Sequence, residues 1–233
     1  MDSGMTIALL GGGTGAGATT ALVALATRAH AAHRRVVVVD ADACGGGIDV
    51  AFGIETVPGV RWEDLLGSDG PLDGERLLER LPSRDDGPQV LSFGRQWCEL
   101  PAGLLDRAVT AVRPVCDLVL VDLGRAAAAM RTERYDHVLL VARGTPSGLA
   151  AAGATVQRLG ARPMLVVRGL REAPALDVAG ALRLDLAGCL PDDRHLAVDL
   201  ERGVPAGSRA RSAYAGACDR LLRDLVVAAE AAA

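Results

Sequence analysis

A glycine-rich segment near the start of the chain constrains its fold more than any other feature. Residues 9–20 read LLGGGTGAGATT, so an apolar run ends, a glycine loop follows, and two threonines begin an alanine-rich segment. This order predicts a buried strand, a tight loop and the first turn of a helix. Such a loop directs backbone N–H groups and the positive end of a helix dipole to one point. We therefore expect an α/β domain with an anion site.

Apolar runs and helix-like segments alternate along the rest of the chain. We expect strands at residues 5–10, 35–40, 88–94, 116–122, 136–142, 162–168 and 186–190. We expect residues 43–53 to be irregular, and we expect helices at residues 19–33, 60–66, 73–81, 104–112, 145–160, 174–182, 195–203 and 212–229. This alternation predicts a three-layer α/β fold, with a mostly parallel sheet covered by helices on both faces.

Composition narrows the classes of function. The chain has 233 residues, and we expect residues 1–233 to form one domain. The net charge of −4 gives no support for a nucleic-acid partner. No apolar run reaches the roughly 18 residues of a membrane span. The five cysteines form no CxxC pair, and we interpret them as reduced thiols of a cytoplasmic protein.

The glycine loop fits the P-loop template G-x-x-x-x-G-K-[ST] at all but one of its defined positions. Gly12, Gly17 and Thr19 match the two glycines and the hydroxyl residue, whereas Ala18 stands where the lysine belongs. There is no lysine anywhere in the chain. Backbone amides and the helix dipole can still hold a phosphate, but the point charge that helps to neutralise the β- and γ-phosphates is missing.

The same residues also fit a second template. The dinucleotide pattern G-x-G-x-x-[GA] is matched by Gly11, Gly13 and Ala16, and Asp40 ends the next strand, where a ribose-binding carboxylate would stand. A glycine turn that binds nothing is a third possibility. The loop alone does not decide between these alternatives.

Carboxylates further along the chain favour the P-loop interpretation. Asp40, Asp42 and Asp49 lie within one short run after the second strand, and Asp122 ends the apolar run CDLVLVD. A dinucleotide site needs one acidic residue at a strand end, whereas a site that binds Mg²⁺ and orients water needs more. An apolar strand that ends in Asp, after a P-loop, is typical of a Walker B segment.

The chain resembles the MinD/ParA class of deviant Walker ATPases at these motifs. Where that class reads K-G-G-x-G-K-[ST]-[ST], residues 13–20 read GTGAGATT, so that Gly13 stands at the signature lysine. The chain is most similar to the CpaE/TadZ branch, including actinobacterial proteins encoded beside Tad-type secretion ATPases. The segments that carry this closer resemblance are DADACGGGIDVAFGIETVPGVRWEDL at 40–65, VLSFGR at 90–95 and LPDDRHLAVDLERGVPAG at 190–207.

The resemblance implies a site for ATP or ADP with Mg²⁺. It places Thr19 and Asp122 on the metal, Asp42 on the attacking water, and Arg168 beside the adenine. The phosphates would contact Gly12, Gly13, Thr14, Gly15, Ala16, Gly17, Ala18, Thr19 and Thr20. Because both loop lysines are absent, we expect slow or absent hydrolysis, and Arg125 or Arg143 is a hypothesis for the missing charge.

The resemblance also implies a partner-recruiting homodimer that positions a Tad-type pilus, a secretion apparatus or a septum. Members of the class often carry an upstream receiver-like domain, which we do not find in this chain. We expect recruitment to a cell pole or septum, with at most indirect membrane contact. Two alternatives stay open: a pseudo-ATPase scaffold that never binds nucleotide, and an NAD(P)-binding enzyme.

Overall fold

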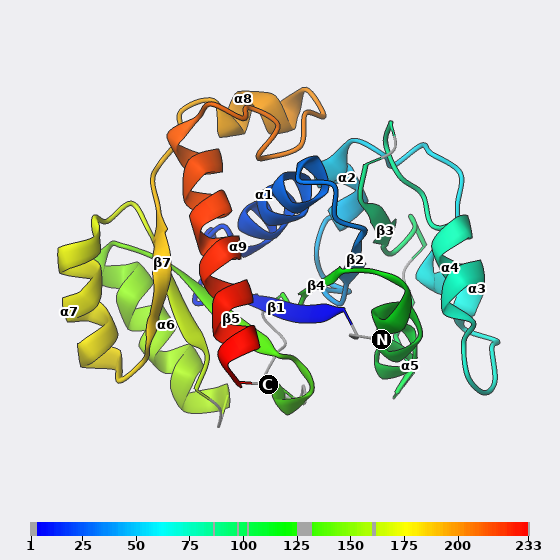
Figure 1. Cartoon of the computed structure of the whole chain (residues 1–233), viewed down its shortest axis with the longest axis horizontal. Coiled ribbons are helices and arrows are strands. Elements are labelled where there is room, and N and C mark those ends of the chain that lie inside the picture. The colour runs from blue at the N-terminus through cyan, green and yellow to red at the C-terminus, as the bar shows by residue number, and fades with distance from the viewer. Residues whose placement is uncertain are drawn as a thin grey trace.

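Seven parallel strands form one sheet at the centre of the protein (Figure 1). The computed structural model describes residues 4–85, 87–96, 98–101, 103–124, 132–159 and 162–232. The strands are β1 (Met5–Gly11), β2 (Val36–Asp40), β3 (Gln89–Leu91), β4 (Leu118–Asp122), β5 (His137–Arg143), β6 (Met164–Arg168) and β7 (Leu186–Leu190). Their order across the sheet is β3-β2-β4-β1-β5-β6-β7, with every pairing parallel.

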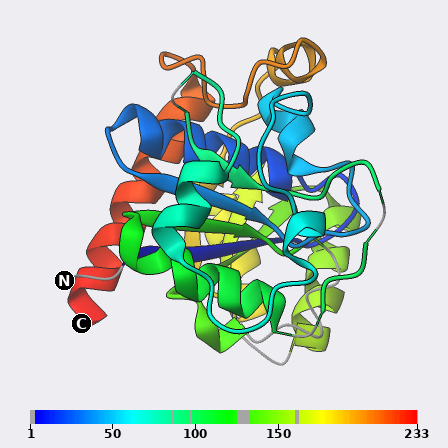
Figure 2. The same ribbon diagram turned by 90° about the vertical axis from the view of Figure 1, so that its right-hand side faces the viewer.

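Helices cover both faces of this sheet, which confirms the predicted three-layer α/β fold (Figures 1 and 2). One face carries α1 (Ala18–Ala31), α2 (Ile48–Phe52) and α9 (Ala213–Ala232). The other carries α3 (Trp62–Leu65), α4 (Gly74–Arg80), α5 (Leu104–Val112), α6 (Pro146–Leu159) and α7 (Glu172–Leu182). Between β7 and α9 lies the short helix α8 (Leu196–Glu201), and two 3₁₀ turns cover Arg113–Val115 and Thr132–Arg134.

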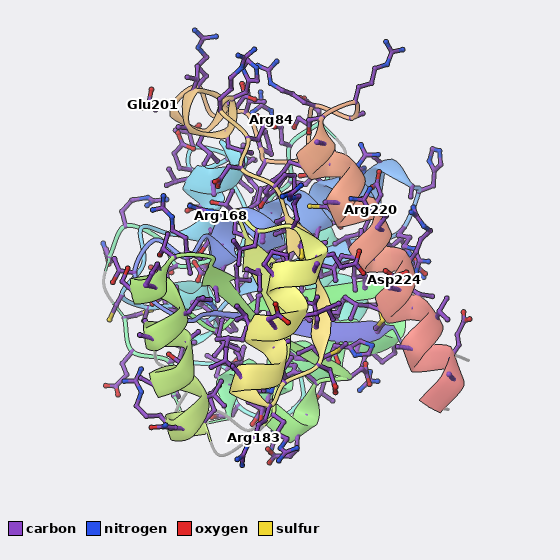
Figure 3. The ribbon with its side chains drawn as sticks, turned by 90° about the vertical axis from the view of Figure 1, so that its left-hand side faces the viewer. Arg84, Arg168, Arg183, Glu201, Arg220 and Asp224 are labelled. Atoms are coloured by element: carbon purple, nitrogen blue, oxygen red, sulfur yellow. The ribbon has the colours of Figure 1, made fainter. Side chains whose placement is uncertain are left out.

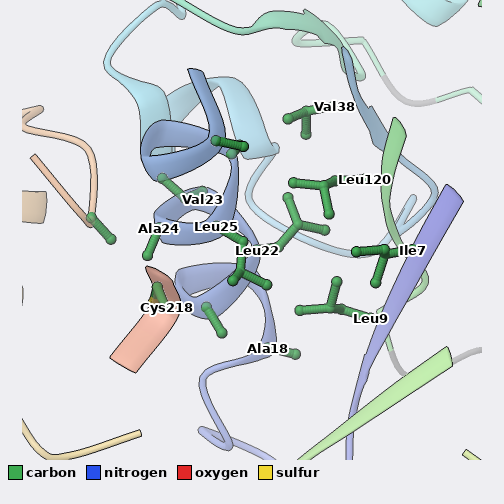
Figure 4. Close-up of a cluster of buried hydrophobic side chains, with 14 of the residues drawn as sticks. Ile7, Leu9, Ala18, Leu22, Val23, Ala24, Leu25, Val38, Leu120 and Cys218 are labelled. Carbon is green, nitrogen blue, oxygen red and sulfur yellow. The ribbon is translucent and has the colours of Figure 1, made fainter. Parts of the chain in front are cut away.

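The core follows from strands that are buried on both faces. Four consecutive valines of β2, residues 36–39, are fully buried, because a covered parallel strand needs apolar side chains on each side. Successive side chains point to opposite faces. Val36 and Val38 therefore join the cluster around α1, and Val37 and Val39 join the cluster on the other face. Figure 4 shows the first cluster, where Leu22 of α1 faces the sheet.

The C-terminal helix α9 packs along α1, as expected for an amphipathic helix that covers the domain. Leu221 and Leu225 are buried in the cluster shared with α1. An ion pair also joins the two helices, with Arg28 Nε 2.8 Å from Asp219 Oδ1. Within the described ranges, the structure contains no helix with the length and apolar character that crossing a bilayer requires.

Some boundaries differ from those expected. The edge strand β3 covers three residues instead of the expected range 88–94, because it pairs only with Val37–Val39 of β2. Residues 43–53, expected to be irregular, contain the helix α2. A run of glycines precedes α2, and Gly47, with φ of 86°, begins it from a left-handed conformation. The glycines mark a sharp bend in the chain, not the absence of secondary structure.

The strand order brings three loops together at the carboxyl edge of the sheet. Strand β4 lies between β2 and β1, so Asp122 is the register partner of both Asp40 and Leu9. The dinucleotide-binding fold instead has the order 3-2-1-4-5-6, in which the first two strands are neighbours. The topology therefore does not support the NAD(P) alternative. It places the loops that follow β1, β2 and β4 around one crevice.

Candidate functional site

The glycine loop lines a cavity of about 360 Å³ at this edge of the sheet. Asp42, from the loop after β2, and Asp122 and Gly124, from the end of β4, complete its wall. Gly11 and all the loop residues from 13 to 20 also line it. The structure thus brings together most of the residues that the sequence analysis assigned to phosphate, metal and water.

Two amides of the loop are already paired within the chain. The N–H of Gly12 donates to Val141 O at 2.8 Å, and the N–H of Ala16 donates to Gly13 O at 3.2 Å. These bonds shape the loop. They also mean that the Gly12 amide, which we expected on a phosphate, is committed to β5 instead.

The first turn of α1 opens towards the cavity without a side-chain cap. Its first intrahelical bond runs from Ala21 N–H to Gly17 O at 2.9 Å, so the amides of Ala18, Thr19 and Thr20 have no acceptor within the helix. There is no acidic residue in this turn. Unpaired N–H groups and the positive end of a 14-residue helix make this the most favourable place for an anion in the loop.

Thr19 and Asp122 are in direct contact. Thr19 Oγ1 donates to Asp122 Oδ2 at 2.6 Å, and the N–H of Gly124 donates to the other carboxylate oxygen at 3.0 Å. Asp122 is only 2% exposed, and burial raises the pKa of its carboxyl, an effect that the two hydrogen bonds oppose. A hydroxyl and a carboxylate are oxygen ligands of the kind that Mg²⁺ prefers, so the pair fits the predicted metal site.

Asp42 reaches the same cavity from the loop after β2. One of its carboxylate oxygens accepts the N–H of Cys44 at 3.2 Å, which holds the side chain in a local turn. Gly124 permits its approach, because a Cβ atom there, at φ of 57°, would collide with the Asp42 carboxylate. Asp42 therefore lines the cavity opposite the glycine loop from a different strand end.

Asp40 and Asp49 have structural roles, although the sequence places them in one run with Asp42. The Asp40 carboxylate is 2% exposed and accepts the N–H groups of Asp42 at 3.0 Å and Ile48 at 2.9 Å. Burial raises its pKa to about 7. Since both oxygens are occupied by backbone groups, Asp40 is not available to a ribose.

Asp49 anchors the same segment to the loop after β3. It is 1% exposed, Arg95 donates to its carboxylate, and Arg61 Nε lies 3.9 Å from the same oxygen. A buried carboxylate needs such partners, because an unpaired buried charge is strongly destabilising. The ion pairs of Asp49 with the two arginines fix the position of α2. Of the acidic residues in this run, Asp42 is the one that lines the cavity.

Arg168 contacts the glycine loop from the end of β6. The Nη1 of Arg168, a residue labelled in Figure 3, donates to Ala16 O at 3.4 Å. Its Nε lies 3.3 Å from Asp192 Oδ1. Arg143, the register partner of Arg168, has an exposed side chain at the end of β5. Arg125 lies outside the described residues. Sequence reasoning missed Asp192, for which the only signal is the pair of aspartates in LPDDRH.

Helix α6 packs tightly on the start of the loop. A Cβ atom on Gly12 would lie 2.9 Å from Cβ of Ala152, and one on Gly13 would lie 2.9 Å from Cβ of Ala151. Glycine at these positions therefore permits the close approach of α6. In this conformation a side chain at position 13 would meet α6.

Comparisons with known proteins give two relatives in sequence. Two uncharacterized proteins of Mycobacterium tuberculosis, from strains CDC 1551 and H37Rv, are each 38% identical to this chain over 234 residues. The alignment covers 94% of this chain but 63% of each relative, so the chain spans less than two thirds of their length. No protein-family model matches the chain.

Solved structures give a comparison of the fold. The MinC:MinD cell division complex of Aquifex aeolicus has a TM-score of 0.75 at 17% identity and covers 96% of both chains. The septum site-determining protein MinD of Pyrococcus horikoshii, complexed with Mg-ADP, has a TM-score of 0.74 at 20% identity over 95% of both. A ParA family ATPase of Chlorobium tepidum has a TM-score of 0.71 at 14% identity, covering 97% of this chain and 98% of its own. The protein thus has the fold of the MinD and ParA P-loop ATPases.

Proposed function

We propose that the protein binds ATP or ADP with Mg²⁺ in the loop cavity. The observation that carries this proposal is the 2.6 Å contact between Thr19 Oγ1 and Asp122 Oδ2 beside the glycine loop. A hydroxyl and a carboxylate in contact beside the loop support a Mg²⁺ site that would join the chain to a bound phosphate. When bound, the metal would supply the positive charge that neutralises phosphate oxygens. The MinD structure with Mg-ADP supports the same ligands.

The phosphate chain would lie against the first turn of α1. The amides of Ala18, Thr19 and Thr20 lack intrahelical acceptors there, and the turn has no competing carboxylate of its own. These groups bind phosphate oxygens without regard to the base. Preference for an adenine nucleotide therefore rests on the resemblance, together with the absence of a guanine-specific N-K-x-D motif from the sequence.

We infer that hydrolysis is slow or absent. Asp42 lines the cavity and is the residue that would orient an attacking water. Phosphoryl transfer also needs positive charge on the transferring oxygens, commonly from a lysine and an arginine. Ala18 stands at the lysine position and is 7% exposed, and the sequence contains no lysine.

The same proposal includes a biological role in positioning a larger apparatus. We infer a homodimer that recruits pilus, secretion or division proteins, in the manner of the CpaE/TadZ branch. The sequence segments at 40–65 and 190–207 support that branch. The fold shared with the MinC:MinD complex supports division-type partners. Recruitment to a pole or septum belongs to the same proposal.

A nucleotide-free scaffold is the second candidate. Two observations favour it: position 18 has no charged side chain, and α6 packs against Gly13, where the related class has its signature lysine. A scaffold would use the same surface to hold a partner without any response to nucleotide.

One experiment distinguishes these candidates. We would measure thermal unfolding of the protein with ATP and Mg²⁺, ADP and Mg²⁺, GTP and NADH in turn, and repeat it with Asp122→Asn. A ligand at 100 times its Kd should raise Tm by roughly 5–10 °C for a chain of this size. We expect a rise with ATP and ADP that depends on Mg²⁺ only in the unmodified protein. A rise with NADH alone would contradict the proposal, and no rise with any ligand would favour the scaffold.

A further inference from the structure

The loop lacks its usual lysine, yet the guanidinium of Arg168 contacts it. Arg168 ends β6, the second strand beyond β1, and its guanidinium reaches across to Ala16 of the loop. We propose that Arg168 supplies the positive charge for bound phosphate that the missing lysines do not supply, and that Asp192 competes with the phosphate for it. This inference rests on the proposed function, and it names the residues that would let the loop bind a nucleotide without a lysine.

The contact between Arg168 and the loop is possible because residue 17 is a glycine, which has no Cβ atom. Gly17 has a left-handed φ of 92°, and a Cβ atom there would lie 2.7 Å from Nη1 of Arg168. The guanidinium therefore fills the space that a side chain at position 17 would occupy. Position 17 immediately precedes the first turn of α1, so the guanidinium adjoins the residue at which that turn begins. Arg168 does not itself line the loop cavity, so its side chain would have to turn towards a phosphate bound there.

Hydrogen bonds hold the guanidinium loosely. Its bond to Ala16 O is long, at 3.4 Å, and the buried Nε makes no hydrogen bond of acceptable geometry despite the nearby Asp192 carboxylate. A buried N–H without an acceptor is unfavourable. A modest rearrangement of Arg168 towards phosphate oxygens would therefore lose little and could satisfy groups that are now poorly bonded.

Asp192 is placed to compete for the same guanidinium. Its side chain is 69% exposed, in contrast to 23% for Arg168, and it lies in the loop that follows β7. Its other oxygen would be 3.1 Å from a Cβ atom on Gly169, so it rests on the backbone next to Arg168. An exposed carboxylate is a weak partner, since water and salt screen it. A polyphosphate with several negative charges should displace it.

The ligand class follows from this chemistry. A planar guanidinium recognises phosphate oxygens in pairs, and this recognition does not involve the base. The affinity for inorganic tripolyphosphate should therefore depend on Arg168 as strongly as the affinity for ATP does. If the guanidinium instead only packed on the adenine, the affinity for tripolyphosphate would not change when Arg168 is replaced.

We would measure Kd by calorimetry for MgATP and Mg-tripolyphosphate with four variants. Arg168→Gln should weaken both ligands by about tenfold to a hundredfold, the range for a charged hydrogen bond. Arg168→Lys should keep much of the affinity, and Asp192→Asn should raise it several-fold. Arg183→Gln is the matched control, because Arg183 is an exposed arginine at the far end of α7 from Arg168 (Figure 3).

The outcomes separate this inference from the proposed function. If the unmodified protein binds neither ligand, the proposed function fails and this inference fails with it. If it binds both and Arg168→Gln binds tripolyphosphate equally well, only the role of Arg168 is overturned. Unfolding curves without ligand verify that each variant folds. If Arg168→Gln fails to fold, Asp192→Asn still tests the proposal. An unchanged affinity of Asp192→Asn for both ligands would contradict the proposed competition between Asp192 and phosphate for Arg168.

Discussion

The hydroxyl of Thr19 and the carboxylate of Asp122 meet at 2.6 Å, although 103 positions separate them in the sequence. One belongs to the first turn of α1 and the other to the end of β4. Because β1 and β4 are neighbours in the sheet, the loop after β1 passes directly beside the last residue of β4. A buried carboxylate and a hydroxyl are thus joined at the wall of the cavity that the glycine loop lines.

The first prediction concerns Mg²⁺. Asp122→Ala removes the carboxylate that Thr19 contacts, so the affinity for ADP should no longer respond to Mg²⁺. We would titrate ADP with and without Mg²⁺ by calorimetry. Thr19→Val is the companion variant, because it removes only the hydroxyl and should reduce the response less. If Asp122→Ala keeps the full Mg²⁺ dependence, the metal binds elsewhere.

The second prediction restores the missing lysine. Ala18→Lys should raise the affinity for ATP by about tenfold or more, since it returns a charged donor to the phosphate site. Ala18 is 7% exposed and lines the loop cavity, so the new side chain would have to extend into that cavity. Ala31→Lys, at the exposed far end of α1, is the control for added charge. Equal affinities of Ala18→Lys and the unmodified protein would show that the loop does not hold phosphate as proposed.

The third prediction compares two glycines of the loop. Gly15 and Gly17 both have positive φ, 69° and 92°, so alanine at either should destabilise the protein by about 1–2 kcal/mol. Gly15 has open space around it, whereas a Cβ at Gly17 would meet Arg168. Urea unfolding should therefore show a larger loss for Gly17→Ala than for Gly15→Ala. Equal losses would mean that Arg168 moves aside freely.

The fourth prediction concerns the pH dependence of stability. Burial raises the pKa of Asp40 from its ordinary value near 4 to about 7, so the folded state binds this proton more tightly than the unfolded chain does. The stability that the protonated group provides is complete below about pH 4 and is lost as pH rises to about 7, by at most about 1.4 kcal/mol per pH unit. Asp40→Asn should flatten this slope in urea unfolding between pH 5 and 7. An unchanged slope would assign it to other groups.

Much of the fold can be read from the sequence, because its signals are local. A run such as RVVVVD has no polar face, so it must be a strand buried on both sides, and the rule that ligands bind at carboxyl ends of strands then points to Asp42 and Asp122. Both carboxylates line the cavity of the glycine loop, and their roles there stay predictions. The nucleotide, the dimer and the apparatus stay predictions.

The rest of the site depends on which strands become neighbours. Nothing local distinguishes Asp42 from Asp49, yet the second is buried against Arg61 and Arg95 because α2 turns it away from the cavity. Likewise, Arg143 and Arg168 both end strands, and only the path across the sheet decides which reaches the loop. Sequence reasoning also gave no reason to expect Asp192 beside Arg168, because the two lie on different loops.

The position of α1 links the loop to a remote part of the surface. Its 14 residues form a helix about 21 Å long. One end begins at Gly17, and near the other Arg28 is tied to Asp219 of α9. Any ligand that pushes the first turn along the helix axis must therefore carry α9 with it or break that tie. An event at the loop would in that way be felt by whatever touches α9, far from the bound molecule.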